Sequence, residues 1–180
     1  KDISRVAIER PLPSRLVQLH RWMVDYYATS SGDCWRSILP AKVTTAPRAR
    51  TLPPTIKPPR PSGDDCTHYL LNACQRSALA QIRAEQSGTI LLHGITGSGK
   101  TEVYKELADD ALNSGQSVIM LVPEISLTAQ LVGEFQQRFP EQVVVTHSAM
   151  TASQRNLDWR NILFSTKPLV IIGPRSALFM

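Results

Sequence analysis

The amino-acid sequence predicts an α/β fold in which helices cover both faces of a parallel β-sheet. After residue 88, apolar runs typical of strands alternate four times with segments of helical periodicity. A glycine-rich stretch at residues 94–101 lies between the first of these strands and the first of these helices. A strand, a glycine-rich turn and a helix in this order are typical of folds that bind phosphate groups.

The N-terminal segment predicts two helices ahead of the sheet. Its apolar positions at helical spacing are Leu16, Leu19, Met23, Tyr26 and Tyr27. Prolines lie just before them, where helix starts tolerate proline, so we expect a helix over residues 14–27. A second, short helix is expected to start near Ser31 or Asp33 and to run to Pro40.

The aromatic residues of this segment allow two interpretations. Tyr26, Tyr27 and Trp35 could be stacking platforms for nucleobases. Aromatic residues at helical spacing are more often core residues, and we expect that role for them here.

A proline-rich run divides the chain. Residues 47–61 interleave prolines with arginines and a lysine, and such a run has few backbone donors and a preset φ. We therefore expect an extended linker over residues 46–66, between an N-terminal unit (1–45) and a second unit (67–180). Its basic residues could touch a nucleic-acid backbone, but a solvated linker is the favoured interpretation.

The second unit begins with a predicted helix that ends near Gln86, followed by a strand at residues 89–93. The helix after the glycine-rich stretch is expected to stop at residues 113–115, where Gly115 supplies a glycine C-cap. Residues 117–122 form a continuous apolar run, which predicts a strand covered on both faces.

The remaining elements follow the same alternation. We expect a helix over residues 127–138, a strand at 143–145 and a strand at 168–172. Between the last two strands, Thr151 and Gln154 have the spacing of a capping box and predict a helix start.

The stretch at residues 94–101 has the spacing of a P-loop, which is a glycine, four residues and then Gly-Lys-Thr. Gly94, Gly97 and Gly99 allow the backbone to approach a phosphate closely. Lys100 is expected to place its ammonium group on the β- and γ-phosphates, and the Thr101 hydroxyl is expected to hold Mg²⁺. Nucleotide binding is the firmest functional inference from these residues alone.

The composition excludes several classes of protein. At 180 residues and 42% hydrophobic the chain can bury a core, but its longest apolar runs are too short to span a bilayer. No apolar signal core follows the first residues, so we predict a cytoplasmic protein without membrane contact. The three cysteines include no C-x-x-C pair and indicate neither a disulfide framework nor a zinc site. A net charge of +5 permits a polyanionic partner without requiring one.

Several stretches together resemble the PriA family of primosomal replication-restart DNA helicases, within superfamily 2. The matching stretches are residues 71–75, 94–104, 121–130, 147–159 and 172–179, in the family's order and spacing. The resemblance covers the chain from about Leu71 to the end, and residues 16–40 more weakly resemble the end of the family's N-terminal DNA-binding domain. It implies a P-loop NTPase (RecA-like) lobe 1, present in part and preceded by a small helical remnant of that domain.

The resemblance implies a role for particular residues. ATP and Mg²⁺ are the implied cofactors, and Gln75 corresponds to the glutamine that reads adenine, next to Cys74 where the family usually has an acidic residue. The implied nucleotide-binding residues are Gln75, Gly94, Thr96, Gly97, Ser98, Gly99, Lys100, Thr101 and Glu102, with Lys100 and Thr101 acting in catalysis. Zinc is expected for the full-length family, but its cysteine ligands are not in this chain.

Two further stretches match DNA-binding motifs of the family. Residues of motif Ia and motif Ib that imply contacts with single-stranded DNA are Pro123, Glu124, Ser126, Thr128, Arg175 and Ser176. Pro174 stands where a threonine is usual, which removes one hydroxyl and one N–H donor. From their residue types alone, Glu124 and Thr128 could simply begin and cap a helix, and Arg175 could pair with a carboxylate. His147 is expected to be structural and not catalytic.

The family resemblance implies part of an ATP-dependent DNA helicase that acts in replication restart and primosome assembly. Its implied partners are forked or single-stranded DNA, other primosome proteins and single-strand-binding proteins. No acidic Walker B strand occurs up to Met180, so these 180 residues alone are expected to hydrolyse ATP negligibly. The alternatives are a non-catalytic DNA-binding module with a relic P-loop and, less in keeping with motifs Ia and Ib, a small-molecule kinase.

Overall fold

The fold is seen in a computed structural model that describes residues 11–41, 43, 70–85 and 87–180. The proline-rich linker expected over residues 46–66 lies outside the described residues, as does Cys66. The division into units therefore stays a prediction.

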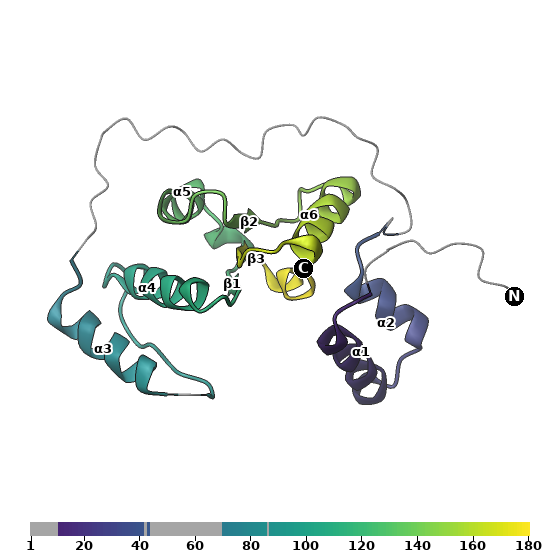
Figure 1. Ribbon diagram of the computed structural model, residues 1–180, viewed down its shortest axis with the longest axis horizontal. Coiled ribbons are helices and arrows are strands. Elements are labelled where there is room, and N and C mark those ends of the chain that lie inside the picture. Colours follow the sequence, from purple (N-terminus) through teal and green to yellow (C-terminus); the bar gives the residue numbers. More distant parts are fainter. Residues whose placement is uncertain (1–10, 42, 44–69, 86) are drawn as a thin grey trace, which may run out of the picture.

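A parallel sheet of three strands forms the centre of the second unit (Figure 1). The strands are β1 (Val118–Leu121), β2 (Val143–Val145) and β3 (Val170–Gly173). Their order is β1-β3-β2, and both neighbouring pairs run parallel, with Val170 opposite Val118 on one side and Val143 on the other. The predicted parallel sheet is confirmed for these three strands.

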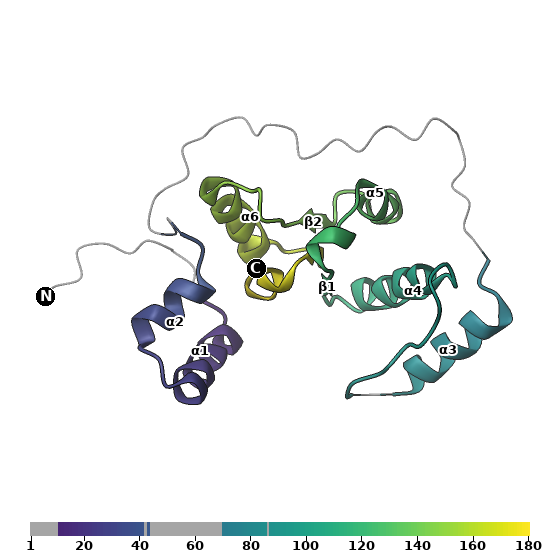
Figure 2. The same ribbon diagram turned by 180° about the vertical axis from the view of Figure 1, so that it is seen from behind.

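Helices surround the sheet on both sides, as Figures 1 and 2 show, with α4 and α5 on one side and α6 and the 3-10 helix η2 on the other. Their bounds are α3 (Ala73–Ala84), α4 (Lys100–Asn113), η1 (Glu124–Ser126), α5 (Ala129–Arg138), α6 (Ala152–Phe164) and η2 (Arg175–Phe179). Two predicted caps are confirmed. Thr151 and Gln154 form the capping box of α6, and Gly115 follows α4 at a φ of 75°.

The main core lies between the sheet and the helices α4 and α5. Phe135 and Phe139 of α5 pack with Ala108 and Leu112 of α4 against Val170 and Ile172 of β3. On β1 the residues alternate, so that Ile119 and Leu121 are 43% and 48% exposed. The prediction that this strand is covered on both faces is therefore wrong, because among the described residues only the face with Val118 and Met120 packs on the core.

The predicted strand at residues 89–93 is also wrong. This run is not a β-strand, and Leu91 is 87% exposed. Apolar composition favours a strand only where a hydrogen-bonded partner lies beside it, and among the described residues no strand of the sheet pairs with this run. The P-loop consequently follows an irregular segment in this structure.

The two N-terminal helices form, α1 over Ser14–Tyr27 as expected and α2 over Ser31–Ile38, which ends before the expected Pro40. They pack through His20, whose ring stacks on Trp35 with centroids 4.1 Å apart and whose Nε2 lies 3.1 Å from the Ser31 hydroxyl. Cys34 and Ile38 are buried between them. Tyr26 and Tyr27 are 68% and 61% exposed, so the core role expected for these two tyrosines is wrong.

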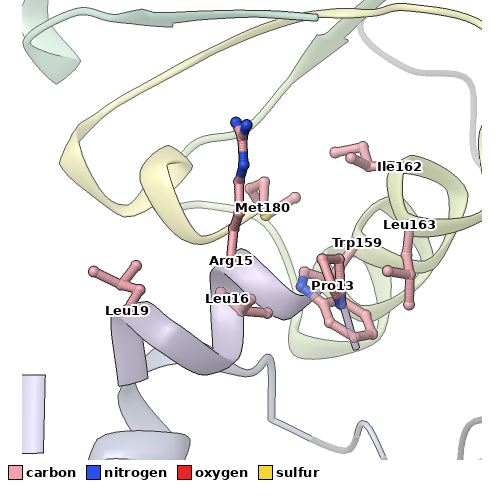
Figure 3. A pocket seen from close by; sticks show the side chains of 8 residues that line it. All are labelled: Pro13, Arg15, Leu16, Leu19, Trp159, Ile162, Leu163 and Met180. Carbon is pink, nitrogen blue, oxygen red and sulfur yellow. The ribbon is translucent and has the colours of Figure 1, made fainter. Parts of the chain in front are cut away.

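A pocket of about 370 Å³ lies where α1 faces α6 and the C-terminal residue (Figure 3). Its lining is mostly apolar and comprises Pro13, Arg15, Leu16, Leu19, Trp159, Ile162, Leu163 and Met180. Nearby, Nη2 of Arg160 on α6 donates a 2.7 Å hydrogen bond to the carbonyl oxygen of Val43. This hydrogen bond joins the segment that follows α2 to α6.

Candidate nucleotide and nucleic-acid sites

The P-loop turns sharply into helix α4. Gly97 and Gly99 adopt φ values of 80° and 77°, which favour glycine, and Gly99 is the N-cap of the helix. The first N–H groups of α4 have no carbonyl of the same helix to bind and carry the positive end of its dipole. Helix and loop together therefore form a cradle suited to a phosphate group.

Lys100 lies folded into this cradle. Its Nζ donates hydrogen bonds of 2.6 Å to the carbonyl oxygen of Gly94 and 2.7 Å to that of Ile95. The ammonium group is thus held over the loop by the chain's own carbonyl groups. A phosphate that enters the cradle would meet this cation already in place.

Gln75 connects helix α3 to the P-loop. Its Oε1 accepts a 2.8 Å hydrogen bond from the N–H of Asn72, and its Nε2 donates to the carbonyl oxygens of Ser98 and Gly99, each at 3.2 Å. Both ends of the amide are engaged by the protein itself, so this geometry supports the P-loop. The adenine-reading role of Gln75 stays a prediction.

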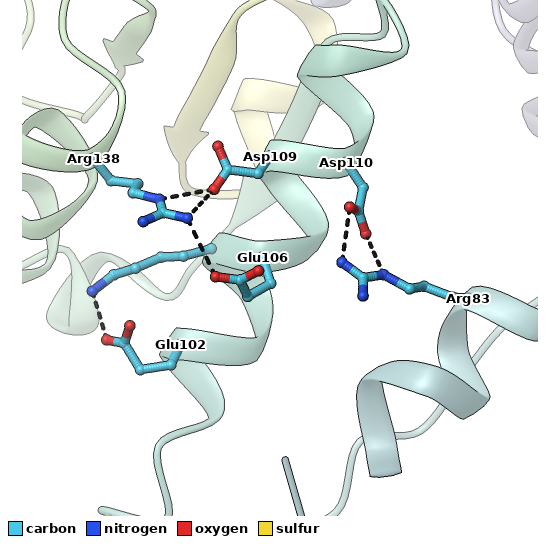
Figure 4. A network of polar contacts seen from close by, with 7 residues as sticks. Arg83, Glu102, Glu106, Asp109, Asp110 and Arg138 are labelled. Carbon is cyan, nitrogen blue, oxygen red and sulfur yellow. Dashed lines mark hydrogen bonds and ion pairs between the residues drawn. The ribbon is translucent and has the colours of Figure 1, made fainter. Parts of the chain in front are cut away.

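Ion pairs fix α4 to its two neighbouring helices (Figure 4). Arg83 of α3 binds Asp110 of α4 through two hydrogen bonds of 2.7 and 2.9 Å. On the other side, Arg138 of α5 binds Glu106 at 3.2 Å and also Asp109 of α4. Helix α4 is therefore held between α3 and α5 by charged side chains as well as by its apolar face.

Lys105 makes a further bridge between α4 and α5. Its Nζ lies 2.7 Å from Oε1 of Glu102 and 3.0 Å from Oε2 of Glu134 on α5. Burial lowers the pKa of Lys105, but the hydrogen bonds to the two carboxylates outweigh it and raise this pKa above its ordinary value. Lys105 is therefore charged throughout the physiological pH range.

The loops after the three strands meet at one edge of the sheet, as expected for the carboxyl ends of parallel strands. The N–H of Val122 donates to the carbonyl oxygen of Gly173, and that of Thr146 to the carbonyl oxygen of Ile172, each at 2.9 Å. The predicted DNA-binding residues after β1 and after β3 are thus brought to the same edge.

Two of these residues also have structural contacts. Thr128 is the N-cap of α5 and accepts a 3.2 Å hydrogen bond from the N–H of Leu131. Glu124 accepts a 2.8 Å hydrogen bond from the N–H of Ser148. Hydrogen bonds from Ser148 lower the pKa of Glu124, and the charge of His147 lowers it further. Both residues begin a helix, which was the alternative interpretation of the sequence.

The other predicted DNA-binding residues lie exposed at this edge. Pro123, Ser126, Arg175 and Ser176 are all exposed. Within the described part of the chain, Arg175 makes no ion pair with a carboxylate, so that alternative is not seen. The guanidinium group of Arg175 is accessible to an anion.

Sequence reasoning missed the residues that join α4 to α5, namely Lys105, Glu134 and Arg138. Some signal was present, since Glu102 and Lys105 have the i,i+3 spacing of a helical ion pair. The contacts between α4 and α5 depend on how the helices pack, which spacing along the chain does not give.

Neither a metal cluster nor a membrane span occurs in the described part of the chain. Over these residues, no group of three or more His, Cys, Asp or Glu side chains is arranged to hold a metal ion. No described helix is both long enough and apolar enough to cross a bilayer.

The three-stranded parallel sheet, its covering helices and the P-loop define an α/β domain of the kind found in helicases. Residues 68–171 match the family described as "Type III restriction enzyme, res subunit", and the chain belongs to this family. Its relatives include the replication restart protein PriA of several bacteria, which confirms the resemblance drawn from the motifs.

Three of these relatives show the extent of the similarity. PriA of Treponema pallidum is 39% identical over 160 residues, which is 88% of this chain and 23% of that protein. PriA of Synechocystis is 50% identical over 90 residues, 50% of this chain and 11% of that protein. PriA of Rickettsia conorii is 31% identical over 184 residues, 100% of this chain and 27% of that protein. The chain thus spans about a quarter of the length of the relatives that match most of it.

Proposed function

We propose that this chain supplies the ATP-binding part and some of the single-stranded DNA track of an ATP-dependent DNA helicase that acts in replication restart. The observation that carries the proposal is that the P-loop helix α4 and the motif Ia helix α5 pack side by side on one sheet. A nucleotide at the first helix and a DNA strand at the second would then act on a single folded unit. The similarity to PriA proteins supports the choice of reaction and of pathway.

The residues of the P-loop suit a triphosphate. The Lys100 ammonium group would exchange the carbonyl oxygens of Gly94 and Ile95 for phosphate oxygens, and the N–H groups at the start of α4 would donate to the same anion. Thr101 would hold Mg²⁺, which supplies neutralisation of the charge on the phosphates. Gln75 would keep the turn at Ser98 and Gly99 in place while the ligand binds.

The sheet edge suits a nucleic-acid backbone. Ser126, Arg175 and Ser176 offer hydroxyl and guanidinium donors, which are the groups that most often contact phosphates. Glu124 is better suited to holding the neighbouring loop than to touching DNA, because a carboxylate repels phosphate and this one already accepts the N–H of Ser148. We therefore propose Thr128 and Glu124 as supports of this track. Ser126, Arg175 and Ser176 are its proposed contacts.

The test is nucleotide and DNA binding by the whole gene product and by its Lys100→Ala variant. Loss of the charged hydrogen bonds of Lys100 is expected to weaken ATP binding about 10- to 100-fold. DNA binding without nucleotide should persist and should weaken as salt is raised. The isolated 180 residues are expected to bind ATP weakly and to hydrolyse it negligibly, so robust DNA-stimulated hydrolysis by them alone would contradict the proposed division of labour.

One observation favours the second candidate, a DNA-binding module whose P-loop is a relic. The segment before the P-loop is not a strand of the sheet, so the loop lacks its usual anchor on one side. In that case DNA would bind with the same affinity with or without ATP, and Lys100→Ala would change nothing. A zinc site and contacts with primosome or single-strand-binding proteins belong to the proposal for the whole protein only.

A further inference from the structure

A continuous chain of polar contacts runs from the P-loop helix to the motif Ia stretch. It begins at Glu102, which directly follows Thr101, and passes through Lys105 to Glu134 on α5 by contacts of 2.7 and 3.0 Å. It ends where Nε2 of Gln130 donates a 3.2 Å hydrogen bond to Oε1 of Glu134. Gln130 lies in the first turn of α5, two residues after its N-cap, Thr128.

Lys105 is the central member of this chain of contacts. Its side chain is 12% exposed, against 26% for Glu102 and 34% for Glu134, so solvent screens the contacts less than on an open surface. Without the ammonium group, two carboxylates from two helices would face each other with no cation between them. The relative position of Glu102 and Glu134 therefore depends on Lys105.

A second bridge further along the helices makes the contact rigid. Arg138, one turn beyond Glu134 on α5, binds Glu106 and Asp109 of α4, and its Nε donates to Asp109 at 2.8 Å. Two bridges along the same pair of helices hinder rotation of one against the other. Of the two, only the Lys105 bridge includes a residue of the first turn of α4, Glu102, so a shift of that turn would reach α5 first through Lys105.

From this geometry we propose that Lys105 is a positioning residue that couples the nucleotide site to the DNA site, through Glu102 on one side and Glu134 with Gln130 on the other. The proposal rests on the proposed function, since it needs both ligands to bind. A nucleotide that draws Lys100 and Thr101 onto its phosphates moves the turn that carries Glu102. Lys105 then conveys this movement to the start of α5, where the loop that is expected to hold the DNA backbone ends.

The experiment measures the linkage between the two ligands in the whole gene product. The dissociation constant of a labelled oligothymidine is determined by fluorescence anisotropy without and with a saturating non-hydrolysable ATP analogue. The ratio of the two values is the coupling factor, and the same factor must appear in the affinity for the analogue with and without DNA. Coupling factors between sites are typically about 5- to 150-fold, so the change is measurable.

Lys105→Met is expected to move this factor several-fold toward one, while the affinity for each ligand alone stays essentially unchanged. Lys105→Arg keeps a cation between the carboxylates and should retain most of the coupling. The matched control is Arg83→Met, which removes the exposed ion pair between α3 and α4 and lies off this chain of contacts. Glu134→Gln, which keeps the size of the side chain, replaces Lys105→Met if the latter does not give a folded protein.

The outcomes separate the two proposals. If the wild-type protein binds neither ligand, the proposed function fails and the coupling role fails with it. If the wild-type protein binds both ligands with linkage and Lys105→Met shows the same factor, the role of Lys105 is refuted while the proposed function stands. If Lys105→Met and Arg83→Met lower the coupling factor equally, the role of Lys105 is likewise refuted, because a general loosening of α4 would then explain the change.

Discussion

The carboxylate of Glu124 accepts a 2.8 Å hydrogen bond from the backbone N–H of Ser148, and this bond joins the loop after β1 to the loop after β2. The two residues are 24 positions apart in the chain, so the bond is a tertiary contact at the carboxyl edge of the sheet. It explains why an acidic residue stands in a stretch that is otherwise suited to binding a polyanion.

The Glu124–Ser148 bond predicts a dependence on pH. Hydrogen bonds from Ser148 lower the pKa of Glu124 below its ordinary value of 4.5. The bond should therefore be fully present above pH 4.5 and be lost as the pH falls through the lowered pKa of the folded state. The amide proton shift of Ser148, followed by NMR on acidification, should report this loss. In Glu124→Gln the chemical shift of the Ser148 amide proton should not change over this pH range. If it still changes in the variant, a group other than Glu124 causes the pH dependence.

Gly173, at the end of β3, has no room for a side chain. A Cβ atom there would lie 2.3 Å from Cγ2 of Thr146 and 2.8 Å from its carbonyl oxygen. Because Thr146 is buried and a backbone atom is involved, Gly173→Ala is expected to lower the free energy of unfolding by about 1–3 kcal/mol. Urea unfolding measures this change.

The control for Gly173 is Gly32 of α2, where the nearest atom to a new Cβ is 3.9 Å away. Gly32→Ala is expected to be neutral or to stabilise by about 0.5–1 kcal/mol, since alanine favours a helix. Equal effects at the two positions would show that close packing at Thr146 is not what requires Gly173.

Phe135 should be among the residues most important for stability. It is 1% exposed and lies in the core that α4, α5 and β3 share. Phe135→Ala is expected to cost about 3–5 kcal/mol, from lost burial and the cavity that remains. Phe164, which is 42% exposed at the end of α6, is the matched control, and its replacement by alanine should cost far less in the same unfolding experiment. A small loss for Phe135→Ala would argue against this core.

Asp158 of α6 is a half-buried carboxyl group whose pKa is raised by burial, against a smaller lowering by His147. A folded-state pKa above the unfolded one means that this group destabilises the fold as the pH rises through the folded pKa. Asp158→Asn is therefore expected to raise the melting temperature at neutral pH by about 1–2 °C. The gain should disappear below pH 3.8, where both states of the wild-type carboxyl are protonated. A gain that is independent of pH would have another cause.

Much of the fold could be predicted from the sequence, because local signals set most element boundaries. The capping box of Thr151 with Gln154 and the glycine after α4 are properties of a few neighbouring residues. The wrong predictions concern contacts between elements that are distant in the sequence. The run at residues 89–93 has the composition of a strand without a neighbour to pair with, and Tyr26 has helical spacing without a surface to cover it.

The same distinction holds for the candidate sites. The P-loop was recognisable because its chemistry needs particular residues at a fixed spacing, and motifs Ia and Ib were found through a resemblance. The bridges made by Lys105 and Arg138 join helices whose contact is set by the packing of Phe135 and Leu112, and no spacing in the chain encodes that.

The carbonyl oxygens of Gly94 and Ile95, which accept hydrogen bonds from Lys100, would compete with a ligand for its ammonium group. Any anion that enters must supply better acceptors than two neutral carbonyl groups. A triphosphate offers several charged oxygens to one ammonium group, whereas a single inorganic phosphate offers fewer and gains less from the exchange. This internal competition would favour long polyphosphate chains over the smaller anions that are abundant in a cell.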